Sequence, residues 1–486
     1  MLEKSFEKVP TEKGPSGIDL SHRHHKLPKL SDHFAARKPS AIRLAQIEFM
    51  RRLTQNTNEK IEVVNTAIGN VSLPMHPAMQ KRLRELGQEG ASFADGVIKY
   101  SATVGNENAC KTFLHIIASS VGTNIEDSNI SKLRVQVTDG GSAAMELIIL
   151  AVGGGAGSGD RPILLIDPAY TNYRAFAERL GRRVVSVSRS LGRDGKFSLP
   201  NWAEIETVIK EHGVSAIVVI PYDNPTGQLF SQETMRELAR ISVKYNLWLI
   251  SDEAYRELYY LDHSRGNNSI WALTEDEIPG IVGRRVSIES ASKVWNACGL
   301  RIGAIVTDSQ QLHIKAVAEN TANLCANVVG QEIFSALLNE SHAELRKWYQ
   351  NQRSYYQVMM QKLSTEIKRL MPGVIISSPD AALYSVIDVR DLVNKDFHAE
   401  DFVMYCASKG SVLLNELNID GQVDGDDGKK FTLLLSPMAE FYGSGSRNRG
   451  RTQMRMAYVE PPQKMALVPK LFSRLLADFL QHRLTQ

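Results

Sequence analysis

Between about residues 130 and 310, short apolar runs rich in β-branched residues alternate with longer amphipathic stretches. The runs of strand length are 133–138, 161–167, 182–188, 215–220, 247–251, 285–290 and 302–308. The stretches with helical length and spacing include 142–152, 172–180, 201–212 and 231–245. Strands that are apolar on both faces need cover on both sides. The alternation therefore predicts an α/β fold, with a large, mostly parallel seven-stranded sheet covered by helices.

The rest of the chain predicts a smaller α+β domain and an N-terminal arm. Residues 1–40 are polar and contain several prolines, and we expect an irregular arm in which the His-rich segment 22–26 forms a solvated basic patch. We expect the N-terminal part of the small domain and the entry to the large domain at 41–95, the large domain at 96–345 and the C-terminal small domain at 346–486. We also expect one long helical stretch over about 309–371 and an exposed acidic, Gly-rich insertion at 415–430.

The composition of the chain argues against several classes of function. The formal net charge of +3 is too small to indicate a nucleic-acid-binding face. The four cysteines (Cys110, Cys298, Cys325 and Cys406) form no CxxC pair, so neither a zinc site nor a disulfide scaffold is expected. The N-terminus lacks the apolar core of a signal peptide, and no apolar run is long enough to span a bilayer. We expect a cytoplasmic protein with no metal, nucleic-acid or membrane partner.

The turns after the strands are where chemistry is expected, because ligands of parallel sheets bind beyond the carboxyl ends of the strands. Gly141 and Ser142 follow the first run and begin a helix, where free N–H groups can hold a phosphate or simply be capped. Tyr170 follows the second run and can either stack on a flat ring or pack in the core. Asn224, in the segment PYDNPTG after the fourth run, has an amide that can donate to a phenolate or carboxylate, although this segment is also a good turn.

The next two turns carry charged side chains. Asp252 follows the fifth run, where a carboxylate is costly to bury without a cationic partner such as a protonated ring nitrogen, and Tyr255 can reach the same ring. Lys293 follows Ser290 in a Ser-rich turn, and Arg301 lies eight residues further on. A lysine amine can form a Schiff base with an aldehyde, and an arginine can grip a phosphate. Taken singly, such a lysine is usually a surface residue.

Together these motifs resemble one family. The ordered set Gly-Gly-Ser, Pro-Ala-Tyr, Asn-Pro-Thr-Gly, Asp-Glu-x-Tyr, Ser-x-Ser-Lys and Gly-x-Arg-x-Gly is similar to that of the class I/II aminotransferases, which are fold-type I pyridoxal-phosphate (PLP) enzymes. The resemblance covers about residues 60 to 465. It implies an aspartate-aminotransferase-like fold and a ping-pong transfer of an amino group from an L-amino acid to a 2-oxo acid.

The resemblance also implies a role for each matching residue. Lys293 would hold PLP as an internal aldimine and then act as the general base. Asp252 would keep the pyridine nitrogen protonated, Tyr255 and Asn224 would hydrogen-bond the phenolic oxygen, and Tyr170 would stack on the ring. The residues implied to hold the phosphate are Gly141, Ser142, Ser290 and Arg301.

Weaker motifs imply three further residues. Tyr100, in IKYSATVG, would reach the phosphate of a neighbouring subunit, which implies a homodimer with shared active sites. Arg455, in TQMRMAYVEP, would bind the substrate α-carboxylate together with Asn224. Gly69, in NTAIGNVSLP, would lie in the segment that closes over this carboxylate. No clear second arginine for a distal carboxylate follows Lys293.

Two other hypotheses stay open at this stage. A lyase or decarboxylase acting on amino acids can use the same residues and the same cofactor. A non-enzymatic regulator with an aminotransferase-like sensor domain would need an N-terminal DNA-binding module, for which residues 1–60 offer too little room and no basic recognition helix.

Overall fold

The computed structural model describes residues 28–55, 59–261, 268–377, 379–417 and 428–484. The chain divides into two units, Met1–Lys38 and Pro39–Gln486. In the described part of the first unit, the short helix α1 (Asp32–Ala35) begins after Ser31, whose hydroxyl accepts a hydrogen bond from the backbone N–H of Phe34. The His-rich segment 22–26 and most of the predicted insertion at 415–430 lie outside the described residues.

The seven predicted strands form one sheet in the second unit. They are β2 (Arg134–Thr138), β3 (Ile163–Asp167), β4 (Val184–Ser188), β5 (Ala216–Val219), β6 (Trp248–Asp252), β7 (Arg285–Ser290) and β8 (Gly303–Thr307). Their order in the sheet is β2-β8-β7-β6-β5-β3-β4. β8 pairs antiparallel with both of its neighbours, β2 and β7, and the other strand pairs in this sheet are parallel. The predicted large, mostly parallel sheet is confirmed.

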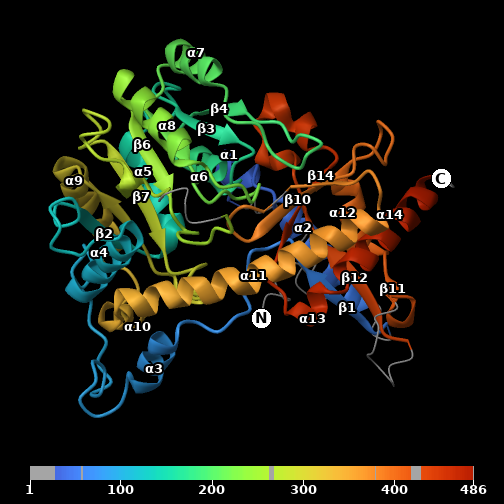
Figure 1. Cartoon of the computed structure of the whole chain (residues 1–486), viewed down its shortest axis with the longest axis horizontal. Helices are drawn as coiled ribbons and strands as arrows, with labels where there is room; N and C mark the ends of the chain where they lie inside the picture. Colours follow the sequence, from blue (N-terminus) through green and yellow to red (C-terminus); the bar gives the residue numbers. More distant parts are fainter. Residues whose placement is uncertain (1–27, 56–58, 262–267, 378, 418–427, 485–486) are drawn as a thin grey trace, which may run out of the picture. The chain divides into compact units, whose positions relative to one another are not determined.

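Helices connect and cover these strands. They are α4 (Glu107–Val121), α5 (Gly140–Val152), α6 (Asn172–Arg179), α7 (Trp202–His212), α8 (Gln232–Lys244) and α9 (Gln310–Asn320). Helix α5 is apolar along most of its length and packs on β7 and β8, while α8 packs on β5 and β6. Both α4 and α9 lie against the edge strand β2 (Figure 1). The expectation of helices between the strands is met.

The predicted long helical stretch 309–371 is wrong in one respect, because it is broken into separate helices. After α9, Leu324 has a φ of +65°, which no α-helix accommodates. Helix α10 (Val328–Phe334) then starts at Asn327, and α11 (His342–Leu370) starts at Ser341. Ser341 and Glu344 form a capping box, which fixes the start of α11.

The remaining strands form two small sheets. β1 (Ile61–Asn65) pairs in parallel with β12 (Lys430–Leu434), which also pairs with β11 (Val412–Leu413). The second sheet has the order β13 (Ser436–Pro437), β14 (Gln453–Ala457), β10 (Tyr384–Asp388) and β9 (Ile375–Ile376). The pairing of β1 with β12 brings an early and a late segment of the chain into one sheet.

Further helices complete the second unit. They are α2 (Ala41–Gln55), α3 (Pro77–Glu85), α12 (Ala399–Ser408), α13 (Pro462–Met465) and α14 (Val468–Leu484). Helix α12 packs on α2 and β12, and α14 packs on β12. The long helix α11 contacts α4 near the large sheet and α14 near the small sheets (Figure 1). Among the described helices, none combines the length and the apolar character needed to cross a bilayer.

Candidate active site

A cavity opens at the carboxyl ends of the large sheet's strands, as the topology predicts. Every predicted site residue except Tyr100 lines it. The predicted residues found there are Gly69, Gly141, Ser142, Tyr170, Asn224, Asp252, Tyr255, Ser290, Lys293, Arg301 and Arg455. Tyr100 lies outside this lining, and 77% of its surface is exposed.

Asp252, the last residue of β6, is held by two donors. The phenol of Tyr173 on α6 and the backbone N–H of Ala254, at 3.1 Å, both donate to its carboxylate. Burial raises the pKa of Asp252, although both hydrogen bonds oppose that shift. Burial likewise raises the pKa of Tyr173 well above its usual value, so the phenol keeps its proton and remains a donor. A cation placed beside Asp252 would stabilise its ionised form.

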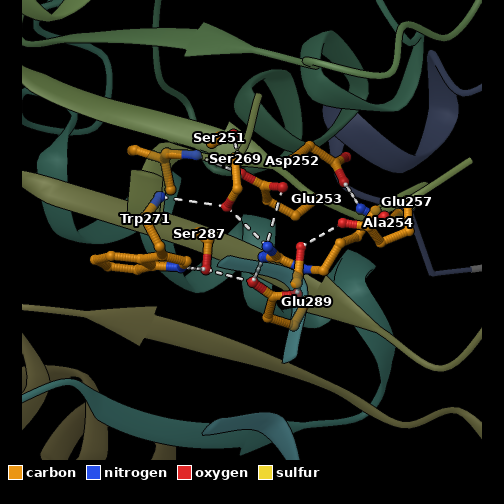
Figure 2. Close-up of polar contacts among 12 residues, drawn as sticks. Ser251, Asp252, Glu253, Ala254, Glu257, Ser269, Trp271, Ser287 and Glu289 are labelled. Carbon is orange, nitrogen blue, oxygen red and sulfur yellow. Dashed lines mark hydrogen bonds and ion pairs between the residues drawn. The ribbon is translucent and has the colours of Figure 1, made fainter. Parts of the chain in front are cut away.

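An ion network lies directly beside Asp252 and joins β6 to β7. Arg256 Nη2 donates to Glu289 Oε1 at 2.5 Å and lies 3.5 Å from Glu253 Oε2. Figure 2 shows Glu253 and Glu289 extending toward one another from adjacent strand ends. The other labelled side chains of the network are Ser251, Ser269, Trp271 and Ser287. Because Glu253 follows Asp252 and Glu289 precedes Ser290, this buried network fixes two cavity residues.

Asn224 links the two sides of the cavity. Its amide nitrogen donates to the hydroxyl of Tyr255 at 3.2 Å, and its amide oxygen accepts from Arg455 Nη1 at 2.9 Å. Burial raises the pKa of Tyr255 well above its usual value. The guanidinium of Arg455 also stacks 4.5 Å from the ring centroid of Tyr384, whose hydroxyl lies 2.8 Å from that of Tyr255. Arg455 is therefore oriented by a hydrogen bond to Asn224 and by the ring of Tyr384.

Lys293 follows β7 and points across the cavity. Its Nζ donates to the backbone carbonyl of Gly69 and lies 3.8 Å from the sulfur of Cys298. A Cβ atom at Gly69 would overlap the hydroxyl of Tyr384 and lie 3.4 Å from Lys293 Nζ. Glycine at position 69 thus lets the backbone come close to the lysine amine.

The N-terminus of α5 and Arg301 form the other end of the cavity. Gly140 has a φ of +82°, and a Cβ there would overlap the guanidinium of Arg301. Arg301 Nη1 donates to the carbonyl of Cys298 at 2.9 Å, which positions the guanidinium beside the first turn of α5. Gly141 and Ser142 lie in that turn, where backbone N–H groups lack helical acceptors. This arrangement suits a dianion such as a phosphate ester.

Several cavity residues were not predicted from the sequence. Among them are Arg43, Tyr173, Cys298, Tyr384 and Phe441. Tyr173 could have been suspected, because it lies three residues after Tyr170 and so begins the next helix on the same side. Arg43 and Tyr384 come from the small sheets' side of the chain, and no local motif marks them.

The chain is similar to known proteins over most of its length. Residues 62–420 match the family model described as aminotransferase class I and II. The chain belongs to this family. This aminotransferase is 24% identical over 378 residues to the aspartate aminotransferase of Sulfolobus acidocaldarius, covering 77% of this chain and 85% of that one. It is 23% identical over 344 residues to kynurenine–oxoglutarate transaminase 3 of Rattus norvegicus, covering 68% of this chain and 70% of that one.

The fold agrees with that assignment. A Thermus thermophilus aspartate aminotransferase single mutant superimposes with a TM-score of 0.71 at 18% identity, covering 92% of this chain and 100% of that one. The aminotransferase is therefore a fold-type I enzyme that depends on pyridoxal phosphate.

The cavity's residues fit this cofactor. Lys293 offers a primary amine for the aldehyde, and Asp252 offers a half-buried carboxylate for a protonated ring nitrogen. Asn224 and Tyr255 present a joined pair of donors for the phenolic oxygen. The guanidinium of Arg301 beside the first turn of α5 suits the phosphate. No group of three or more metal-ligating side chains is found in the described ranges of the chain.

Proposed function

We propose that this enzyme transfers the amino group of an L-amino acid to a 2-oxo acid in a ping-pong cycle, with Lys293 as the residue that carries the chemistry. The observation that supports this proposal most is that three residues with the required chemistry lie around one cavity. Lys293, Asp252 and Arg455 come from three distant parts of the chain and line one cavity.

When bound, pyridoxal phosphate supplies an aldehyde for amines and a protonated ring that withdraws electrons from the substrate α-carbon. In this proposal Asp252 keeps the proton on the ring nitrogen, supported by the hydrogen bond from Tyr173. Lys293 Nζ accepts the proton that leaves the α-carbon, as a positioned general base. Tyr170, which lines the same cavity, would pack against the face of the ring.

Arg455 and Asn224 would orient the substrate. The planar guanidinium of Arg455 suits a carboxylate, and its buried Nε has no hydrogen-bond partner among the described residues. An α-carboxylate bound there would satisfy that donor. Because Gly69 allows the backbone close to Lys293, the α-carbon of such a substrate can lie within reach of the amine.

We also propose domain boundaries, an oligomeric state and a location for the enzyme. The large domain would span 96–345, with the small domain formed by 41–95 and 346–486. Tyr100 is exposed and does not line the cavity of its own chain, which supports a homodimer in which it reaches the phosphate of the partner's site. We propose a cytoplasmic location as well.

The test is a spectral titration of the purified holoenzyme with single amino acids. Loss of the visible cofactor band, followed by its recovery on addition of a 2-oxo acid, supports transamination and identifies the donor. Release of ammonia and a 2-oxo acid without recovery would instead indicate a lyase. Equilibrium ultracentrifugation, together with complementation of a Tyr100→Phe subunit by a Lys293→Ala subunit, tests the shared sites.

A further inference from the structure

Tyr384 is a buried tyrosine of the cavity wall to which the proposed function gives no task. It is the first residue of β10, and only 2% of its surface is exposed. A Cβ atom at Gly69 would overlap its hydroxyl, so the glycine leaves free the space that this hydroxyl occupies. The hydroxyl therefore lies at the cavity wall, between the backbone of residue 69 and the side chain of Tyr255.

The hydroxyls of Tyr384 and Tyr255 share one hydrogen bond of 2.8 Å, and either oxygen can be the donor. The two rings meet edge to face, with their centroids 5.7 Å apart and their planes at 80°. Among the described residues, the Tyr384 hydroxyl makes no hydrogen bond other than this one. The direction of the bond is therefore set by what else the Tyr255 hydroxyl binds.

A phenol has one proton to donate and two lone pairs with which to accept. The Tyr255 oxygen already accepts from the Asn224 amide at 3.2 Å, which leaves it one proton and one free lone pair. If Tyr255 gives its proton to the phenolic oxygen of the cofactor, it has none left for Tyr384. The bond between the two tyrosines then persists only with Tyr384 as its donor.

We propose that Tyr384 is a positioning residue that donates to Tyr255 and so directs the Tyr255 proton at the phenolic oxygen of the cofactor. This inference rests on the proposed function, in which Tyr255 serves the cofactor, and adds the residue that fixes the direction of its hydrogen bond. With both lone pairs engaged, by Asn224 and by Tyr384, the Tyr255 hydroxyl acts toward the cavity as a donor alone. Each bond in such a chain polarises the next, which strengthens the bond to the cofactor.

The ring of Tyr384 has a second contact, which two substitutions separate from the role of its hydroxyl. The guanidinium of Arg455 lies 4.5 Å from the ring centroid. Tyr384→Phe keeps that stacking and removes only the hydroxyl, whereas Tyr384→Leu removes both. We expect kcat to fall about 3- to 10-fold in Tyr384→Phe with an unchanged KM for the amino acid, and KM to rise as well only in Tyr384→Leu.

The decisive measurement needs no substrate. The visible band of the resting holoenzyme changes with pH as the proposed linkage between Lys293 and the cofactor loses a proton that it shares with the phenolic oxygen. A donor to this oxygen competes with that proton, so losing the donor moves the midpoint of the transition to higher pH. We expect a higher midpoint in Tyr384→Phe and a larger shift in Tyr255→Phe. The double variant should match Tyr255→Phe, because the two residues act through one bond.

Tyr442→Phe is the matched control. It also loses a buried hydrogen bond, of 2.9 Å to Gln453 outside the cavity, and should leave the midpoint in place. A wild-type midpoint in Tyr384→Phe, or a shift that adds fully to that of Tyr255→Phe, overturns the proposal. An unshifted midpoint in Tyr255→Phe overturns the role of Tyr255 as well. Because the titration involves no turnover, it decides the role of Tyr384 even if the enzyme proves to be a lyase rather than a transaminase.

Discussion

Arg455 Nη1 donates a hydrogen bond of 2.9 Å to Asn224 Oδ1 across 231 positions of the chain. The same amide donates to the hydroxyl of Tyr255 through its nitrogen. One side chain therefore sets the orientation of the arginine proposed for the substrate and of the phenol proposed for the cofactor.

Replacing Asn224 by Ala removes both bonds, so we expect substrate binding and turnover to change together. KM for the amino acid should rise about 10-fold and kcat should fall several-fold, since each lost hydrogen bond to a charged or buried group is worth about 1–2 kcal/mol. Steady-state kinetics measure both. A rise in KM with unchanged kcat would show that Asn224 serves Arg455 alone.

Replacing Lys293 by Ala should abolish transamination without unfolding the protein. We expect kcat to fall at least about 10⁴-fold, because both the amine and the general base are lost. Turnover assays and thermal unfolding measure the two effects, and Lys81→Ala on α3, an exposed lysine, serves as the matched control. In the wild type, borohydride reduction followed by peptide mapping should label Lys293, and labelling at another lysine contradicts the assignment.

Tyr173→Phe removes a donor to Asp252. Because that hydrogen bond lowers the pKa of Asp252 against the effect of burial, its loss should raise this pKa further. The acidic limb of the profile of kcat/KM against pH should then move to higher pH, and kcat should fall about 3- to 30-fold. Tyr245→Phe, which loses a hydrogen bond of 2.7 Å to Glu206 near the surface, should leave the limb in place.

The ion network beside Asp252 is expected to stabilise the folded protein. Arg256→Met leaves the buried carboxylates Glu253 and Glu289 without their cation, and should lower the free energy of unfolding by about 3–5 kcal/mol. Glu253→Gln should be tolerated to within about 1 kcal/mol, because an amide oxygen can still accept from Ser251 and Ile270. Denaturant titration of both variants compares them, and equal losses would show that the charges themselves are unimportant.

His76 makes the stability depend on pH. Burial lowers the pKa of His76 to about 4, and its Nδ1 accepts a hydrogen bond from the backbone N–H of Ala78 at the start of α3. The unfolded chain, with an ordinary histidine pKa of about 6.5, binds more protons between these values. Stability should thus be lost as the pH falls from about 6.5 to 4, by about 1–2 kcal/mol once solvent screening is allowed for. His76→Asn keeps the cap and should flatten this part of the melting-temperature profile, and an unchanged slope would contradict the assignment.

The large sheet and most of its site follow from local patterns. Apolar runs predict β2 to β8, and the rule that ligands bind beyond the carboxyl ends of strands leads to Asp252, Lys293 and Asn224. The sequence does not predict the break in the helical stretch at Leu324, because a positive φ in a non-glycine residue depends on packing rather than on composition.

Residues supplied by distant segments were harder to predict. Tyr384 joins the site only because β10 pairs with β14, which also carries Arg455. Arg43 joins it through the position of α2, and no spacing along the chain records that juxtaposition. Arg455 itself was found through a resemblance, since an isolated arginine in a strand carries no signal of its own.

The pairing of β1 with β12 has a consequence for how the enzyme is made. Strand β1 leaves the ribosome before the strands of the large sheet, whereas its partner at 430–434 is synthesised after all of them. The strands of the large sheet are complete well before then, so that sheet can form while β1 still waits with its backbone unpaired. Gly69 and Arg455 meet only after β14 has been synthesised, which means that a nascent chain can bury most of its core and still lack a working site.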